Sequence, residues 1–141
     1  MQLDEATARQ RFASVPVVRL ATVDALGRPH LVVTTFAVDG DLIHLAVDQK
    51  PKSSRELKRI RNIRTNPAVA VLADHYDDDW RQLWWVRADG WARIITEPQL
   101  MARPIDLLSA RYPHYASDPP FGPVVAITVT NWSGWAYSDS D

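Results

Sequence analysis

The sequence predicts a mainly β domain, a six-stranded antiparallel β-barrel with flanking helices. Short runs rich in β-branched residues alternate with turn residues along most of the chain. Asp39-Gly40 lies between two apolar runs, and Asp-Gly in that position is a strong hairpin signal. One helical pattern interrupts the strands, between the third and the fourth. Strands that mostly follow one another in this way are typical of a small antiparallel barrel.

The first third of the chain predicts one helix and three strands. The helix covers residues 3–13 and ends at Val15-Pro16. The strands are residues 17–24, 30–38 and 41–48. Gly27 supplies the positive φ of the first turn, and Asp39-Gly40 forms the second.

A basic segment, residues 50–67, follows the third strand. It holds seven of the 16 Lys and Arg residues of the chain, and one acid, Glu56. Ser53 followed by Glu56 is a capping box, which opens a helix. Asn66-Pro67 ends the helix, because proline disfavours a helical residue before it. Apolar residues at spacings of three predict one narrow buried stripe on it: Leu57, Ile60 and Ile63.

The rest of the chain predicts three more strands and a helix. The strands are residues 68–74, a run over 83–96 that is broken or bulged at Asp89-Gly90, and residues 124–130. The helix covers residues 98–111 and is interrupted or restarted at Pro104. We expect residues 112–123, with four prolines, to be a loop, and residues 131–141 to be a solvent-exposed tail.

Composition indicates one domain, residues 1–141, in which 46% of the residues are hydrophobic. No apolar run approaches the ~20 residues that span a bilayer. Asp4 and Glu5 stand where a secretion signal is positively charged. The lack of cysteine excludes disulfides, thiolate metal sites and cysteine nucleophiles. We therefore expect a cytoplasmic protein that does not associate with membranes.

The basic segment predicts an anion site. A helix N-terminus with converging Lys and Arg side chains binds phosphate well. The alternative is a solvated surface face, which such a pattern often forms. A nucleic-acid partner is not expected, because the net charge is −1 and the pI is about 6.4, whereas nucleic-acid-binding domains are usually basic as a whole.

Two other clusters have residue types that can carry chemistry. The acidic residues between Asp74 and Asp79 could bind a hard cation, but the run lacks the glycine and the distal glutamate of a calcium loop. We expect a solvated loop there, and no metal. Trp84 and Trp85 are adjacent and so face opposite sides of their strand. One is expected in the core or an interface, and the other could wall a pocket.

Four motifs, in this order of elements, carry a family resemblance: Leu20-Ala21-Thr22-Val23, Gly27-Arg28-Pro29, Asp39-Gly40-Asp41 and Arg61-Asn62-Ile63-Arg64-Thr65-Asn66-Pro67. With them the chain resembles the pyridoxamine 5′-phosphate oxidase-like proteins, which have an FMN-binding split barrel. Asp74-His75-Tyr76, Trp80 and residues 83–90 are similar to an actinobacterial subgroup that is thought to use the deazaflavin coenzyme F420.

The resemblance implies a homodimer with a cofactor at its interface. The function it implies is hydride transfer between F420 and an unidentified small organic substrate. FMN is the alternative cofactor, and a non-catalytic carrier of F420 or haem is the alternative function. The implied cofactor contacts are Thr34, Thr35 and Phe36 at the ring, Lys50, Lys52, Ser53, Arg55, Lys58 and Arg59 at the phosphate, and Trp85.

No catalytic motif is present, so no catalytic residue is assigned. Hydride transfer requires mainly proximity and orientation, since the cofactor carries the difficult chemistry. The candidates for a proton donor are His75, Tyr76, Tyr137 or a bound water. Residues 132–135 lack the basic residues that bind substrate in true pyridoxamine phosphate oxidases, so vitamin B6 chemistry is not expected.

Overall fold

A computed structural model describes residues 1–47 and 57–138 of the chain. Its strands form one curled antiparallel sheet: β1 (Val18–Val23), β2 (Pro29–Thr34), β3 (Ala37–Asp39), β4 (Leu42–Ala46), β5 (Ala68–His75), β6 (Trp84–Ile95) and β7 (Val124–Ala136). Their order across the sheet is β2-β1-β5-β6-β7-β4-β3. The mainly β, antiparallel class that the sequence predicts is therefore confirmed.

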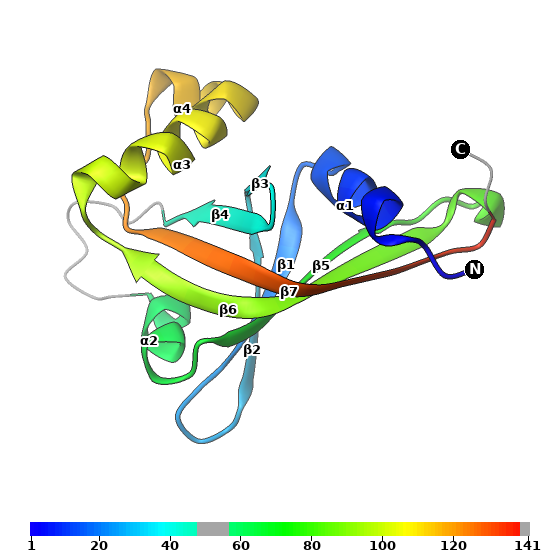
Figure 1. Ribbon diagram of the computed structural model, residues 1–141, viewed down its shortest axis with the longest axis horizontal. Coiled ribbons are helices and arrows are strands. Elements are labelled where there is room, and N and C mark those ends of the chain that lie inside the picture. The colour runs from blue at the N-terminus through cyan, green and yellow to red at the C-terminus, as the bar shows by residue number, and fades with distance from the viewer. Residues whose placement is uncertain (48–56, 139–141) are drawn as a thin grey trace.

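The helices lie around this sheet (Figure 1): α1 (Glu5–Ser14), α2 (Lys58–Thr65), α3 (Pro98–Arg111), α4 (Pro113–Ser117) and a 3-10 turn, η1 (Trp80–Gln82). α3 and α4 lie together at one end of the long strands β6 and β7, and α2 lies below these strands in the view of Figure 1. The N-terminus lies at the opposite end, where the ammonium group of Met1 donates to the carbonyl of Ala136. None of the helices in the described ranges is both long and apolar enough to cross a membrane.

The predicted strand 30–38 is wrong as one strand, which raises the strand number from six to seven. β2 ends at Thr34 and β3 starts at Ala37. Between them, the N–H of Phe36 donates to the hydroxyl of Tyr112 (3.2 Å), and its carbonyl accepts from Arg111 (3.2 Å). Side chains at the end of α3 thus satisfy a backbone that would otherwise pair with a strand. β2 and β3 consequently lie at opposite edges of the sheet.

The basic helix α2 begins later than its sequence predicts. Its N-cap is Leu57, in an extended conformation and without a side-chain cap, so the Ser53 capping box does not open it. Ser53 and Glu56 themselves lie outside the described residues. The predicted buried stripe and the end at Asn66 are both confirmed, with Ile60 and Ile63 buried.

Three further predictions need correction, and one is confirmed. α3 continues through Pro104, and the predicted loop 112–123 contains α4. The predicted tail is largely β7, which continues to Ala136 because residues 131–136 pair with β6. The bulge at Asp89-Gly90 is confirmed. A Cβ on Gly90 would lie 2.3 Å from the carbonyl oxygen of Thr128, so only glycine allows this close approach of β6 and β7.

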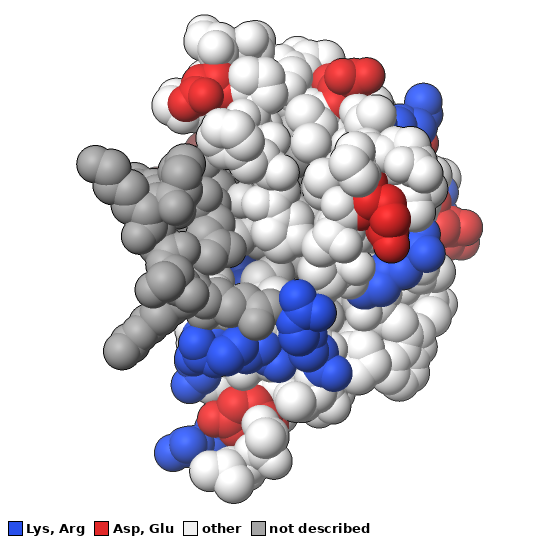
Figure 2. All heavy atoms as spheres, turned by 90° about the vertical axis from the view of Figure 1, so that its left-hand side faces the viewer, with Lys and Arg blue, Asp and Glu red and all other residues white. Residues whose placement is uncertain are grey.

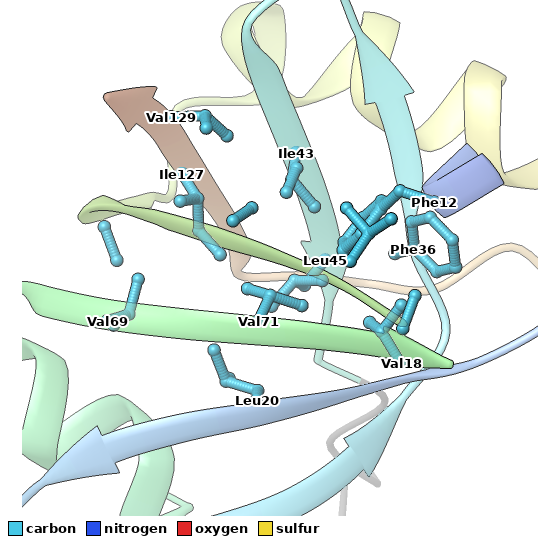
Figure 3. Close-up of a cluster of buried hydrophobic side chains, with 14 of the residues drawn as sticks. Phe12, Val18, Leu20, Phe36, Ile43, Leu45, Val69, Val71, Ile127 and Val129 are labelled. Carbon is cyan, nitrogen blue, oxygen red and sulfur yellow. The ribbon is translucent and has the colours of Figure 1, made fainter. Parts of the chain in front are cut away.

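The hydrophobic core lies between the inner face of the sheet and α1 (Figure 3). Phe12 of α1 packs edge-to-face on Phe36 and on Trp132, with ring centroids 5.2 and 5.1 Å apart. Side chains of β1, β4, β5, β6 and β7 belong to the same cluster. Those labelled in the figure are Val18, Leu20, Ile43, Leu45, Val69, Val71, Ile127 and Val129.

Candidate functional site

The predicted cofactor contacts fall in four places along the chain. Thr34, Thr35 and Phe36 lie at the end of β2 and in the link to β3, Lys58 and Arg59 lie in α2, Trp85 lies in β6, and Lys50, Lys52, Ser53 and Arg55 lie outside the described residues.

At the end of β2, the three predicted ring contacts differ in burial. Thr34 is buried, and its hydroxyl donates to the carbonyl of Thr35. The ring of Phe36 is fully buried in the core, with the guanidinium of Arg111 4.3 Å from its centroid. Thr35 is only half-buried, and its hydroxyl lies 2.9 Å from the hydroxyl of Tyr115 in α4. Of the three side chains, that of Thr35 is thus the least buried.

Tyr112 and Tyr115 contact the link between β2 and β3 through their hydroxyl groups. The hydroxyl of Tyr112 lies 2.8 Å from the carbonyl of Pro16 and 3.1 Å from that of Phe36. Burial raises the pKa of Tyr112, so the group stays a neutral donor at physiological pH. The sequence analysis did not single out Tyr112 and Tyr115. Two signals could have found them: Pro113 suits the first turn of a helix, and the two tyrosines are three residues apart, as on one packed face of a short helix.

The basic face of α2 provides the positive charge of the site. Figure 2 shows Lys and Arg side chains gathered on this side of the molecule. The ammonium of Lys58 lies 3.9 Å from the carboxylate of Asp24. Arg59 is half-buried, and no carboxylate among residues 1–47 and 57–138 pairs with it. Burial lowers the pKa of Arg59, and electrostatic interaction with Tyr115 partly offsets that shift.

The end of β4 packs against α3 and α4. Ala46, the last residue of β4, packs in one buried cluster with Tyr115, Ala37 and Leu108. The described chain therefore has a half-buried guanidinium on α2 and, separately, a pair of hydroxyls between α4 and the end of β2. Guanidinium and hydroxyl groups both form hydrogen bonds with phosphate or carboxylate oxygens.

The third place is the outer face of the sheet, where Trp85 stands. Trp85 is 39% exposed, whereas its neighbour Trp84 is half-buried, packs against the core and stacks on His75. The prediction that the two rings face opposite sides is confirmed. Trp85 borders an open cavity of about 720 Å³. Its other wall residues come from four adjacent strands: Arg19, Ala21, Leu31, Ala70, Val71, Leu72, Asp74 and Arg87.

The candidate proton donors are separated from the basic helix within one chain. His75 ends β5, and Tyr137 follows β7 and packs edge-to-face on Trp135. These strand ends lie at the end of the sheet where the N-terminus lies, away from α2 (Figure 1). A single chain therefore does not bring His75 or Tyr137 to Arg59.

A sequence profile described as pyridoxamine 5′-phosphate oxidase matches residues 4–136. The chain belongs to this family. No protein of curated function matches it in sequence. As a member of the pyridoxamine 5′-phosphate oxidase family, it shares its fold with many solved structures.

Three of the solved structures illustrate the fold. A conserved hypothetical protein from Mycobacterium tuberculosis is 25% identical, with a TM-score of 0.74 over 95% of this chain and 85% of that one. An FAD-binding protein from Mesorhizobium loti is 22% identical, with a TM-score of 0.73 over 95% of both chains. The haem storage protein HutZ from Vibrio cholerae is 17% identical, with a TM-score of 0.67 over 91% of this chain and 92% of that one. The split-barrel fold is thereby confirmed.

Proposed function

We propose that this protein is a dimeric oxidoreductase that binds the deazaflavin coenzyme F420, with FMN as the alternative cofactor. The observation that carries the proposal is Arg59, a half-buried guanidinium without a carboxylate partner in the described chain. A positive group that is partly removed from water favours an anionic ligand, because the desolvation of the charge is offset when the ligand binds. Family membership supports a flavin-type ligand for this position.

The number of basic residues favours F420 over FMN. The segment 50–67 holds seven Lys and Arg residues, and Lys58, Arg59, Arg61 and Arg64 lie on α2. One phosphate, as in FMN, needs few of them. F420 carries a phosphate and an anionic oligoglutamate tail, so it could engage more of this charge.

The chain's own part in the reaction is to bind and orient. Lys58 and Arg59 would hold the phosphate, and the backbone at Thr34 and Thr35 would lie against the ring. When bound, the cofactor supplies the hydride chemistry. Orientation of the two reactants then lowers the barrier without any catalytic motif in the protein.

A second copy of the chain would complete the site. Leu31 and Val33 of β2 are 67% and 58% exposed, and they lie on the same sheet face as Leu72, Trp85 and Trp135. Apolar patches of this kind on a protein surface usually mark interfaces. The cofactor would then lie beside this interface, with aromatic residues of the partner completing its pocket.

An equilibrium titration tests the cofactor assignment. Purified protein is titrated with F420, FMN and haem, with tryptophan fluorescence and the haem Soret band as signals. We expect the tightest binding for F420, weakened by salt, and a loss of about 1–3 kcal/mol of binding free energy in Arg59→Gln. Arg81→Gln, an exposed arginine of η1 paired with Asp79, is the control and should bind normally.

Other results would redirect the proposal. Preferential binding of FMN would move the protein to the flavin branch of the family, and a haem complex would support a storage or carrier role. Binding of F420 without oxidation of its reduced form by a panel of quinones and enones would support a carrier. Binding of none of the three would overturn the proposal.

A further inference from the structure

We propose that His44 of β4 is a pH-sensitive switch for the docking of α3, which detaches from the sheet when the imidazole beneath it binds a proton. The detached helix would release the link between β2 and β3, because residues at its end hold that link. The inference goes beyond the proposed function and does not depend on it. It rests on the burial of His44 and on the contacts that α3 makes around it.

His44 lies between the sheet and α3. It is 96% buried, and its direct neighbours on the same sheet face are Ala37 in β3 and Ala126 in β7. Ala46, two residues further along β4, lies on that face as well. The side chains of α3 that pack in hydrophobic clusters with these alanines are Met101, Ile105, Leu107 and Leu108. Because α3 packs on the alanines around the imidazole, the helix covers it.

The docked helix leaves a protonated imidazole without hydrogen-bond acceptors. Nδ1 of His44 is buried and has no hydrogen-bond partner in the described part of the chain. Nε2 lies 3.8 Å from the carboxylate of Asp39, which is longer than a hydrogen bond. A protonated imidazole has two N–H donors. The burial of both donors and of the charge, with no acceptor in reach, is unfavourable.

The charges around His44 do not compensate for this burial. The carboxylate of Asp39 already accepts two hydrogen bonds from Arg103 of α3, at 2.8 and 3.1 Å. Arg93 of β6 pairs with Ala126 and so lies on the same sheet face, whereas β7 contributes the uncharged Ala126 itself. Burial is the main cause that lowers the pKa of His44, and it outweighs the attraction of Asp39. The two arginines lower that pKa further, so the imidazole is neutral while α3 is docked.

Detachment of α3 would remove this obstacle to protonation. With the helix away, water solvates the imidazole, and the pKa of His44 returns toward the usual 6.5. The docked state has the lower pKa, so below about pH 6.5 the detached state binds more protons and acid favours it. One proton shifts this equilibrium by up to about tenfold per pH unit. Above that pH the imidazole is neutral in both states, and the docked state is retained.

The end of α3 carries the residues that hold the link between β2 and β3. The hydroxyl of Tyr112 accepts from the N–H of Phe36 at 3.2 Å. Arg111 donates to the carbonyl of Phe36 at 3.2 Å and also to the carbonyl of Val15, which follows α1. Detachment of α3 would break these contacts. Proton uptake in β4 would thus loosen a link that belongs to the candidate cofactor site.

Amide hydrogen exchange, followed by mass spectrometry, measures the detachment directly. The cofactor-free protein is compared at about pH 7.5 and about pH 5.5, after correction for the pH dependence of intrinsic exchange. We expect the protection factors of α3 and α4 to fall by up to about tenfold on acidification. They should stay below those of β7 and respond little to low concentrations of urea, since detachment of these helices exposes less surface than unfolding does.

Three variants test the role of the imidazole. His44→Met removes the titrating group and should abolish the fall. His75→Gln changes an exposed histidine at the opposite end of the sheet from α3 (Figure 1), and as the control it should behave like the wild type. Arg93→Gln, at an exposed position, should show a smaller fall, because loss of the guanidinium raises the pKa of His44 under the docked helix.

Equal falls in the wild type and His44→Met would overturn the inference. Exchange of α3 no faster than that of β7 would also overturn it, because the helix would then open only by global unfolding. If His44→Met does not fold, Arg93→Gln decides, and a fall as large as in the wild type would contradict the switch.

Discussion

At the scale of single residues, His44 has its titration set by burial. It is 96% buried in β4, and its Nε2 lies 3.8 Å from the carboxylate of Asp39. Arg103 of α3 binds the same carboxylate with two hydrogen bonds, and Arg93 of β6 adds a further positive charge nearby. Burial lowers the pKa of His44 more than Asp39 raises it, so the imidazole is neutral at physiological pH.

This burial predicts a pH-dependent stability. With the folded pKa below the usual 6.5, the unfolded chain binds more protons than the folded one once the pH falls below about 6.5. The free energy of unfolding contributed by His44 is therefore fully present above that pH and is lost as the pH falls toward the folded pKa. Urea unfolding from about pH 7.5 to about pH 5.5 should show a steeper loss in the wild type than in His44→Met.

The control for this measurement is His114→Gln, which changes an exposed histidine of α4. Its pH dependence should match that of the wild type. Equal slopes for the wild type and His44→Met would show that the burial of His44 does not govern stability in this pH range.

At the scale of elements, the position of α2 depends on one buried polar contact. Nδ2 of Asn62 donates to the hydroxyl of Thr22 in β1 at 3.0 Å, and both residues are buried, at 4% and 1% exposure. Ile60 and Ile63 pack into the core beside them. The contact fixes α2 against β1, and with it the orientation of Arg59.

Removal of the amide should destabilise the fold and weaken the anion site together. We expect Asn62→Ala to cost about 1–3 kcal/mol, because the buried hydroxyl of Thr22 loses its donor. Combination with Thr22→Val should recover part of that cost, since no buried polar group is then left unpaired. Urea denaturation of the three variants measures the coupling. A double variant no more stable than Asn62→Ala would contradict this account.

The same elements show how much the sequence could predict. The Asp39-Gly40 hairpin, the stripe of α2 and the alternation of Trp84 and Trp85 depend on residues close together in the chain, and they are confirmed. The break at Thr35-Phe36 depends on Tyr112 and Arg111, some 75 residues away. No pattern of neighbouring residues in the sequence indicates a contact between segments so far apart in the chain.

The candidate site could be predicted in part, for the same reason. The basic charge of α2 is local in sequence, so Lys58 and Arg59 could be singled out. Tyr115 becomes a candidate only when α4 folds back on the end of β4. The burial of the Phe36 ring likewise follows from its contact with Phe12, and the spacing of residues around Phe36 does not indicate that contact.

At the scale of the whole molecule, the outer sheet face is suited to a second copy of itself. Its charged residues are paired within one chain, Arg19 with Asp74 at 2.8 Å and Arg87 with Asp89 at 3.0 Å. A twofold interface brings like surfaces together, so unpaired charge there would repel the copy. Internally paired charges beside exposed leucines and tryptophans avoid that repulsion.

We therefore expect a dimer in solution, broken by a charge placed on this face. Leu31→Asp should give a folded monomer, because Leu31 is 67% exposed and its replacement disturbs little within one chain. Leu100→Asp, a 54% exposed leucine on α3, is the matched control and should remain dimeric. Analytical ultracentrifugation measures the masses, and circular dichroism confirms the fold. A monomeric wild type, or a dimeric Leu31→Asp, would place the interface elsewhere. A monomer that still binds F420 with wild-type affinity would show that one chain alone completes the cofactor site.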